Sequence, residues 1–152
     1  MLLNYYQTVS SGQNRAMSPV AHFLASLLGA HRDPLTLHRV GHDTHIATVL
    51  ETAFDSASRN RGLLGRSRLE AGRALIIAPC SLVHTFRMAF PIDLVFAARD
   101  GRVLKLRERV QPNRISGSFG AFAVIEMAAG AIEASGLVVG DVLEVRGAQP
   151  GP

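Results

Sequence analysis

The densest run of apolar residues lies in the middle of the chain, between Cys80 and Phe96, and Pro91 divides it. Four polar residues interrupt the run: His84, Thr85, Arg87 and Asp93. Short apolar runs on either side of a turn residue are typical of two neighbouring buried strands. The pattern therefore predicts strands over residues 83–88 and 92–98, with the polar residues gathered at one end of them.

Further short strands are predicted on both sides of this run. They lie over residues 46–50, 72–78, 102–106, 121–127 and 141–146, with helical turns starting at Asp55 or Ser56 and over 131–135. Residues 112–120 are expected to form a loop or a broken strand. Many short strands with little helix predict a mainly β (α+β) fold, a small closed or half-closed β-barrel with one or two short helices.

The first 45 residues follow a different pattern. Apolar residues between Val20 and Leu28 have helical spacing, and Ser18, Pro19 and Gly29 mark the two ends, so we expect an amphipathic helix over 18–29. Its apolar face is expected to dock on its own domain or on a second copy as a homodimer. Residues 31–44 read as a connector. We thus expect an N-terminal extension over 1–45, a β-rich domain over 46–146 and a flexible tail over 147–152.

Composition narrows the class of protein. Apolar residues make up 47% of the 152 residues and charged ones 18%, as in globular domains. The net charge of +4 comes from scattered arginines without interleaved aromatic residues, so we do not expect nucleic-acid binding. A single cysteine excludes an intramolecular disulfide, and no apolar run reaches the roughly 20 residues of a membrane span. We expect a cytoplasmic protein, with a secreted or periplasmic one as the alternative.

The polar cluster is the candidate functional site. A hairpin centred near Phe90 would make His84 and Asp93 cross-strand partners, either to contact a ligand or to hold the strands together. Arg61 precedes a glycine-bounded segment, Gly62 to Gly65, and with the flanking Arg66 and Arg68 it would make an electropositive rim for a carboxylate or phosphate. The candidate ligand-binding residues are therefore His84, Thr85, Arg87, Asp93 and Arg61.

Two other combinations of residues are weaker candidates for a functional site. Cys80 and His84 invite a nucleophile–base pair, but four residues of extended strand separate them by ~13 Å, so we expect Cys80 to pack as a small apolar group and assign no catalytic residue. The spacing of His38, His42 and His45 resembles a set of metal ligands. It lies in the predicted connector without a supporting scaffold, so we expect no metal and no cofactor.

Several motifs fall in a characteristic order. They are Arg61-Gly-Leu-Leu-Gly65, Cys80 with His84-Thr-Phe-Arg-Met88, Phe90-Pro-Ile-Asp-Leu-Val-Phe96, Asp100-Gly101 and Gly136-Leu-Val-Val-Gly-Asp141. Together they resemble the prokaryotic family called domain of unknown function 192, over about residues 46–146. The sequence departs from the family pattern at Met127-Ala-Ala-Gly130 and in the loop Ser116 to Gly120. The resemblance implies a small single-domain β-rich fold and no established activity.

The sequence favours a small binding or accessory domain whose barrel rim contacts a small anionic ligand or a protein partner. One alternative is a hydrolase-like enzyme that uses His84 and Asp93, with or without Cys80. Another is an oligomerising structural protein. We favour a non-enzymatic role, because no complete set of catalytic groups can be assembled from the sequence.

Overall fold

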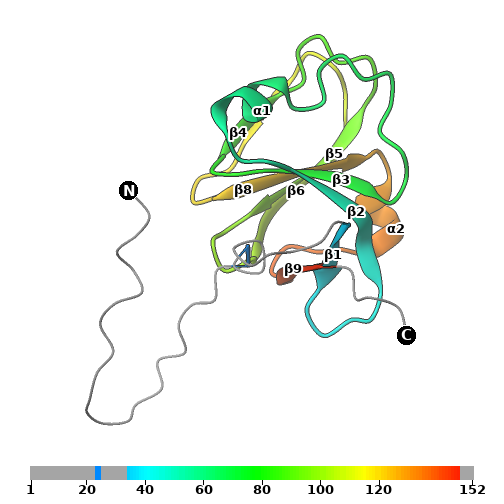
Figure 1. Ribbon diagram of the computed structural model, residues 1–152, viewed down its shortest axis with the longest axis vertical. Coiled ribbons are helices and arrows are strands. Elements are labelled where there is room, and N and C mark those ends of the chain that lie inside the picture. The colour runs from blue at the N-terminus through cyan, green and yellow to red at the C-terminus, as the bar shows by residue number, and fades with distance from the viewer. Residues whose placement is uncertain (1–22, 25–33, 148–152) are drawn as a thin grey trace, which may run out of the picture.

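The computed structural model is mainly β with two short helices, and it describes Phe23, Leu24 and residues 34–147 (Figure 1). Its elements are β1 (Leu35–Arg39), β2 (His45–Ala53), α1 (Ser56–Arg61), β3 (Arg73–Ile77), β4 (Leu82–His84), β5 (Ile92–Ala97), β6 (Val103–Val110), β7 (Ile115–Gly117), β8 (Ala123–Ala128), α2 (Ala131–Ser135) and β9 (Leu143–Gly147). Most predicted strands are therefore confirmed, with shifted ends. The predicted helix over 18–29 lies outside the described residues except for Phe23 and Leu24, which form a turn, and the predicted tail lies outside them from residue 148.

Seven strands form one sheet in the order β6-β5-β8-β3-β2-β1-β9, and β4 pairs with β7 in a separate two-stranded sheet. All neighbours in the large sheet are antiparallel except β2 and β3, which run parallel and are connected through α1. The sheet is not closed into a barrel, and the predicted closure is not confirmed. Its two edge strands, β6 and β9, are joined only by the bridge between Arg102 and Val142 and the backbone hydrogen bonds beside it, within the described residues.

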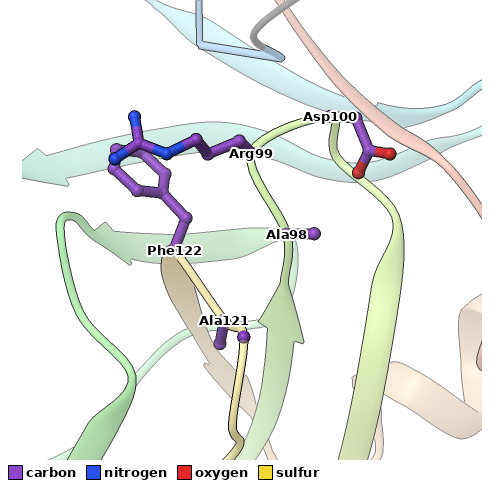
Figure 2. A pocket seen from close by; sticks show the side chains of 6 residues that line it. Ala98, Arg99, Asp100, Ala121 and Phe122 are labelled. Atoms are coloured by element: carbon purple, nitrogen blue, oxygen red, sulfur yellow. The ribbon is translucent and has the colours of Figure 1, made fainter. Parts of the chain in front are cut away.

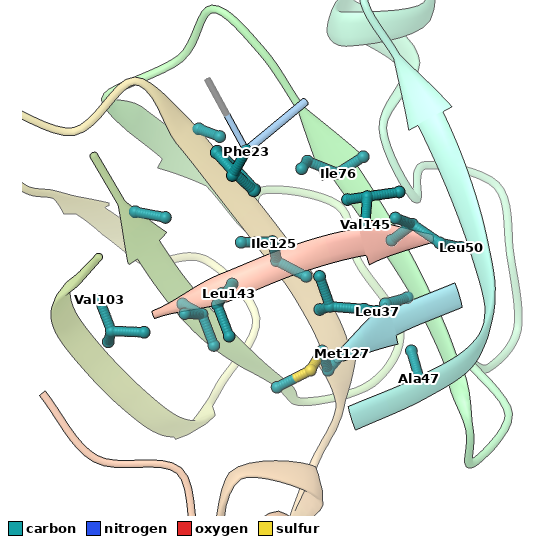
Figure 3. Packing of buried hydrophobic residues seen from close by; sticks show 14 of the residues in the cluster. Phe23, Leu37, Ala47, Leu50, Ile76, Val103, Ile125, Met127, Leu143 and Val145 are labelled. Carbon is teal, nitrogen blue, oxygen red and sulfur yellow. The ribbon is translucent and has the colours of Figure 1, made fainter. Parts of the chain in front are cut away.

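The large sheet carries a hydrophobic core on each face. The first core includes side chains from all seven strands, together with Ile132 of α2 and with Phe23 and Leu24 (Figure 3). The second core lies on the other face, where Leu63, Leu69 and Val83 cover the central strands. Strands β3, β5 and β8 contribute to both cores, which is why they read as nearly continuous apolar runs rather than alternating ones.

The predicted connector over residues 31–44 contains a strand, β1. Leu35 and Leu37 are buried in the first core, and β1 pairs with β2 on one side and β9 on the other. The boundary expected near residue 45 would therefore cut through a paired sheet. Phe23 also packs in this core: its backbone N–H donates to Arg99 O at 3.1 Å, and its side chain lies against Gly101 (φ +86°), where any Cβ would clash. Two residues of the predicted dimer face thus pack on their own domain.

The predicted core of the central run is confirmed in part. Ile92, Leu94 and Phe96 are fully buried, and Met88 and Phe90 pack partly against the second core. Phe86 is 41% exposed, so its predicted core position is wrong. The strand ends at His84 instead of continuing to Met88, and the chain beyond it turns with Arg87 in a left-handed conformation (φ 63°).

We predict that Phe96→Ala lowers the free energy of unfolding by about 3–5 kcal/mol, because it leaves a cavity in a fully buried position. Phe86→Ala is the matched control and should cost less than about 1 kcal/mol, since the ring is already in contact with water. Chemical denaturation of both variants measures the difference. Equal losses would contradict the assignment of Phe96 to the core.

We also predict that a chain starting at residue 46 does not unfold cooperatively, because it loses Leu35 and Leu37 and leaves β2 and β9 without their shared partner. A chain of residues 22–152, which keeps every described residue, should retain the transition of the full chain. Thermal unfolding followed by circular dichroism tests this. An unchanged midpoint for residues 46–152 would show that β1 is dispensable.

Candidate functional site

Two hollows on the surface have similar volumes but different chemistry. The first, of about 410 Å³, lies between the β5–β6 turn and the loop before β8 and is lined by Ala98, Arg99, Asp100, Gly120, Ala121 and Phe122 (Figure 2). There the Arg99 guanidinium lies 4.3 Å from the centre of the Phe122 ring. In the part of the chain that the structure describes, no buried ionisable side chain lines this hollow. It therefore offers little with which to fix a ligand.

The second hollow, which we call the Glu126 cavity, has a volume of about 400 Å³. It lies where the end of α1, the end of β3, strand β4 and strand β8 meet. Its lining residues are Arg59, Asn60, Arg61, Gly62, Leu63, Leu64, Ile77, Pro79, Cys80, Leu82, Val83, His84, Met88 and Glu126. This lining combines apolar walls with a few ionisable groups, as ligand sites do.

Glu126 is the buried ionisable group of this cavity. It is 4% exposed, and its direct neighbours on the flanking strands are Leu75 and Leu94. Its Oε2 atom has no hydrogen-bond partner among the described residues. Loss of hydration in this apolar environment raises the pKa of Glu126 to about 7, although nearby Arg66 acts in the opposite direction. A carboxyl group so perturbed and lining a cavity is a marker of functional sites.

Cys80 also lines the cavity, and its thiol donates to Leu82 O at 3.2 Å. Burial raises the pKa of the Cys80 thiol, and the nearby Glu126 raises it further. The thiol is therefore held in its protonated, weakly nucleophilic form at neutral pH. This does not favour a cysteine nucleophile.

Arg61 and His84 lie in the cavity lining with uncommitted polar atoms. Both side chains are exposed, and within the described residues neither the Arg61 guanidinium nor the His84 ring forms a hydrogen bond or an ion pair. The His84 ring is held by stacking on Phe86, with the ring centres 5.1 Å apart. The helix ends as predicted: Gly62 (φ 47°) caps α1, and its N–H donates to Ser58 O. The cavity thus has two available donors besides its buried acceptor.

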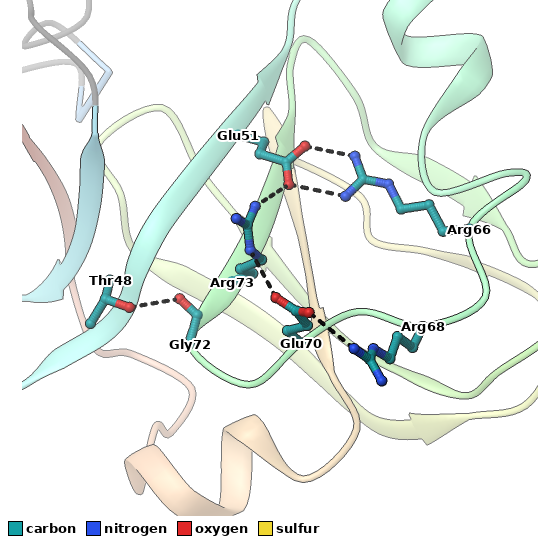
Figure 4. A network of polar contacts seen from close by, with 7 residues as sticks. All are labelled: Thr48, Glu51, Arg66, Arg68, Glu70, Gly72 and Arg73. Carbon is teal, nitrogen blue, oxygen red and sulfur yellow. Dashed lines mark hydrogen bonds and ion pairs between the residues drawn. The ribbon is translucent and has the colours of Figure 1, made fainter.

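The other arginines of the predicted rim are already paired (Figure 4). Arg66 binds Glu51 with two hydrogen bonds, of 3.0 and 2.6 Å, and holds the pKa of that carboxyl below its usual range. Arg68 lies 3.3 Å from Glu70, which also binds Arg73. The network fastens the loop after α1 onto β2 and β3. Of the three arginines predicted for the rim, Arg61 alone remains available.

The predicted hairpin between His84 and Asp93 is wrong. Strand β4 pairs with β7, which puts His84 opposite Ile115, whereas Asp93 lies opposite Met127 of β8. Asp93 is fully buried, and its two oxygens accept backbone N–H groups from Arg109, Gly130 and Ile132. It therefore holds the start of α2 and an irregular turn of β6.

Thr85 and Arg87 do not line the Glu126 cavity. Thr85 is buried, donates to Gln111 O at 2.8 Å and accepts the backbone N–H of Arg114 at 2.9 Å. Arg87 is exposed, and its backbone N–H lies 3.4 Å from the side-chain oxygen of Asn113. Of the five predicted ligand-binding residues, Arg61 and His84 are brought together at one cavity.

The histidines of the predicted connector lie apart from this cavity. His38 is buried in β1, and its ring lies against that of His45 at a tilt of 48°, with the ring centres 4.3 Å apart. Its Nε2 atom lies 2.9 Å from the Thr36 hydroxyl. His42 instead contacts Arg39. No group of three or more histidine, cysteine or acidic side chains that could hold a metal is found among the described residues.

Glu126 is the residue that sequence reasoning missed. It lies in the predicted strand over 121–127, in the run Ala-Val-Ile-Glu-Met-Ala. One ionisable residue inside an apolar run of strand length signals either an exposed edge or a buried functional group. Only the position of β8 in the sheet, between β3 and β5, shows that Glu126 is a buried group and not an exposed edge residue.

These features define the class of protein: a mainly β domain with a cavity built around a buried carboxyl group. The chain belongs to DUF192, an uncharacterized ACR family, whose model matches residues 38–145. No curated protein sequence matches the chain.

Two solved structures share this fold. One is a protein of unknown function from Novosphingobium aromaticivorans, with a TM-score of 0.64 and 24% identity, covering 73% of this chain and 83% of that one. The other, from Sinorhizobium meliloti, is described as a "putative transcription regulator" and has a TM-score of 0.62 and 24% identity, covering 73% of this chain and 91% of that one. At this identity the likeness concerns the fold alone. Among the described residues no helix has the length and apolar character needed to cross a membrane.

The pKa of Glu126 gives a prediction with a definite sign. The pKa of Glu126 is 4.5 in the unfolded chain and about 7 in the folded one. Between these pH values the unfolded chain releases a proton that the folded chain keeps, so the free energy of unfolding falls as pH rises. Glu126→Gln removes this loss. The free energy of unfolding of the variant, minus that of the wild type, should increase by about 3 kcal/mol over this range and then level off. Urea unfolding at a series of pH values measures this difference, and a constant difference would show that Glu126 titrates normally.

Proposed function

We propose that this protein is a binding domain that takes a small anionic ligand in the Glu126 cavity, with Arg61 and His84 contacting the anion. The observation that supports the proposal is that these two side chains line one cavity with their hydrogen-bonding groups uncommitted among the described residues. An arginine can bind a carboxylate or phosphate with two parallel hydrogen bonds.

The volume agrees with this role. About 400 Å³ lies in the range of small-molecule sites, roughly 300–1,000 Å³. The remaining arginines in the surroundings do not compete for the ligand, because Arg66 is bound to Glu51 and Arg59 donates to Phe54 O at 2.5 Å. Arg61 would therefore be the principal charged contact.

The enzymatic alternative finds less support. A hydrolase built on His84 and Asp93 needs these side chains together, but Asp93 is fully buried and both its oxygens accept backbone N–H groups. The thiol of Cys80, with its raised pKa, would be a poor nucleophile. The oligomeric alternative relies on an apolar face of which Phe23 and Leu24 are already buried in their own domain.

Cys80 supplies a test, because it lines the cavity and is the only cysteine. We expect inorganic phosphate or acetate, added against chloride at constant ionic strength, to slow the reaction of Cys80 with N-ethylmaleimide in a saturable manner. Arg61→Gln should weaken this protection about ten-fold or more, since hydrogen bonds to charged groups contribute roughly 1.5–3 kcal/mol. The rate of thiol modification, followed by mass spectrometry, gives the apparent Kd.

The matched control is Arg107→Gln. Arg107 is exposed, does not line the cavity and, like Arg61, has no side-chain partner among the described residues. It should leave the protection unchanged. If neither anion protects Cys80, or if both arginine variants behave alike, the proposed function is wrong.

A further inference from the structure

The floor of the Glu126 cavity carries an acidic group, whereas its entrance carries basic ones. Arg61 and His84 are exposed where they line the cavity, whereas Glu126 is 4% exposed and extends from β8, a strand buried on both faces. A purely anionic ligand would satisfy Arg61 and His84 but would meet a carboxyl group at the other end. The lining is therefore complementary to a molecule with two different ends.

The second end must satisfy Glu126, because the protein itself does not. Oε2 of Glu126 has no hydrogen-bond partner among the described residues. The backbone of Gly62 approaches Oε2, since a Cβ atom added to this glycine would lie 3.8 Å from it. Arg66 is the cation that acts on it electrostatically, but two of its nitrogens are already hydrogen-bonded to Glu51. Burying an unpaired polar group costs about 1–3 kcal/mol, and more when the group is charged.

We infer that the Glu126 cavity takes a small zwitterion, whose anionic group is bound by Arg61 and His84 and whose ammonium group donates to Glu126. The anionic end rests on the proposed function, and the ammonium end is the new element. An ammonium group supplies three donors and a positive charge, so its contact with the part of the Glu126 carboxyl group that lines the cavity favours the ionised carboxylate. The ligand as a whole is neutral, and each of its ends meets a group of complementary chemistry, basic at the entrance and acidic at the floor. An ω-amino acid is the simplest molecule of this class.

The length of the ligand can be determined with a homologous series. We would measure protection of Cys80 by glycine, β-alanine, 4-aminobutyrate, 5-aminopentanoate and 6-aminohexanoate, each against the carboxylate of equal chain length that lacks the amine. At the length that spans the cavity, the amino acid should bind at least ten-fold more tightly than its amine-free counterpart. Isothermal titration calorimetry on the full chain provides an independent Kd.

Two variants separate the ends of the ligand. In Glu126→Gln, the advantage of the amino acid over the plain carboxylate should disappear, whereas the plain carboxylate should bind as before. In Arg61→Gln, both compounds should weaken together. If the carboxylates bind and the amine never improves the affinity at any length, the zwitterion inference is overturned while the proposed anion site stands. If no carboxylate binds, the proposed function itself fails.

A pH series on the wild type requires no variant and covers the case in which Glu126→Gln does not fold. The ratio of the two affinities should increase as pH rises to about 7, because burial raises the pKa of Glu126 to that value and the ammonium group needs the ionised form. The other titratable or charged groups that face the cavity or Glu126 are Arg59, Arg61, Arg66, Cys80 and His84. They meet both members of each pair, so the ratio isolates Glu126 once the affinities are expressed per ionised carboxylate of each ligand. A ratio that does not change with pH would contradict the inference.

Discussion

Burial of β3, β5 and β8 on both faces is the constraint on which the rest of the molecule depends. Their side chains must be apolar on both sides, and the segments around them must then cover two faces instead of one. Strands β1 and β9 with α2 complete the first core, while the loop after α1 and strand β4 cover the second through Leu63, Leu69 and Val83. The cavity arises where this second cover is incomplete.

Two buried acidic residues of these strands have different surroundings. The side-chain oxygens of Asp93 in β5 accept three backbone N–H groups, and these hydrogen bonds hold the start of α2 and the turn of β6. Glu126 of the neighbouring β8 has no such support for Oε2, and its carboxyl group is left with a pKa of about 7. Two acidic residues on adjacent buried strands thus differ in role because their surroundings differ, which distinguishes an architectural carboxylate from a chemically available one.

The sequence predicted the individual helices and strands better than it predicted which strands pair with one another. The strands around Pro91 and the glycine-capped α1 follow from apolar runs and turn residues that lie close together in the chain. Strand β1 was missed because its partners are β2 and the distant β9, and because histidine, proline and glycine around it suggest a loop. For the same reason, His84 was assigned to Asp93 when its strand pairs with β7. Arg61 and His84 were recognised as polar residues near turns, but Glu126 acquires its meaning only from burial.

The pairing of β1 with β9 has a consequence for synthesis of the chain. Leu35 lies opposite Gly147, so the first strand of the sheet cannot find its outer partner until more than a hundred residues have followed it. At roughly 5–20 residues per second, this interval lasts about 5–20 s on the ribosome. During that time Leu35 and Leu37 lack the strand that covers them, and pairings of high sequence separation form slowly even afterwards. The nascent chain therefore passes through a period in which the unpaired edge of β1 and its apolar side chains are open to other chains. Pairing of this edge with β9 leads to folding, whereas pairing with another chain leads to aggregation.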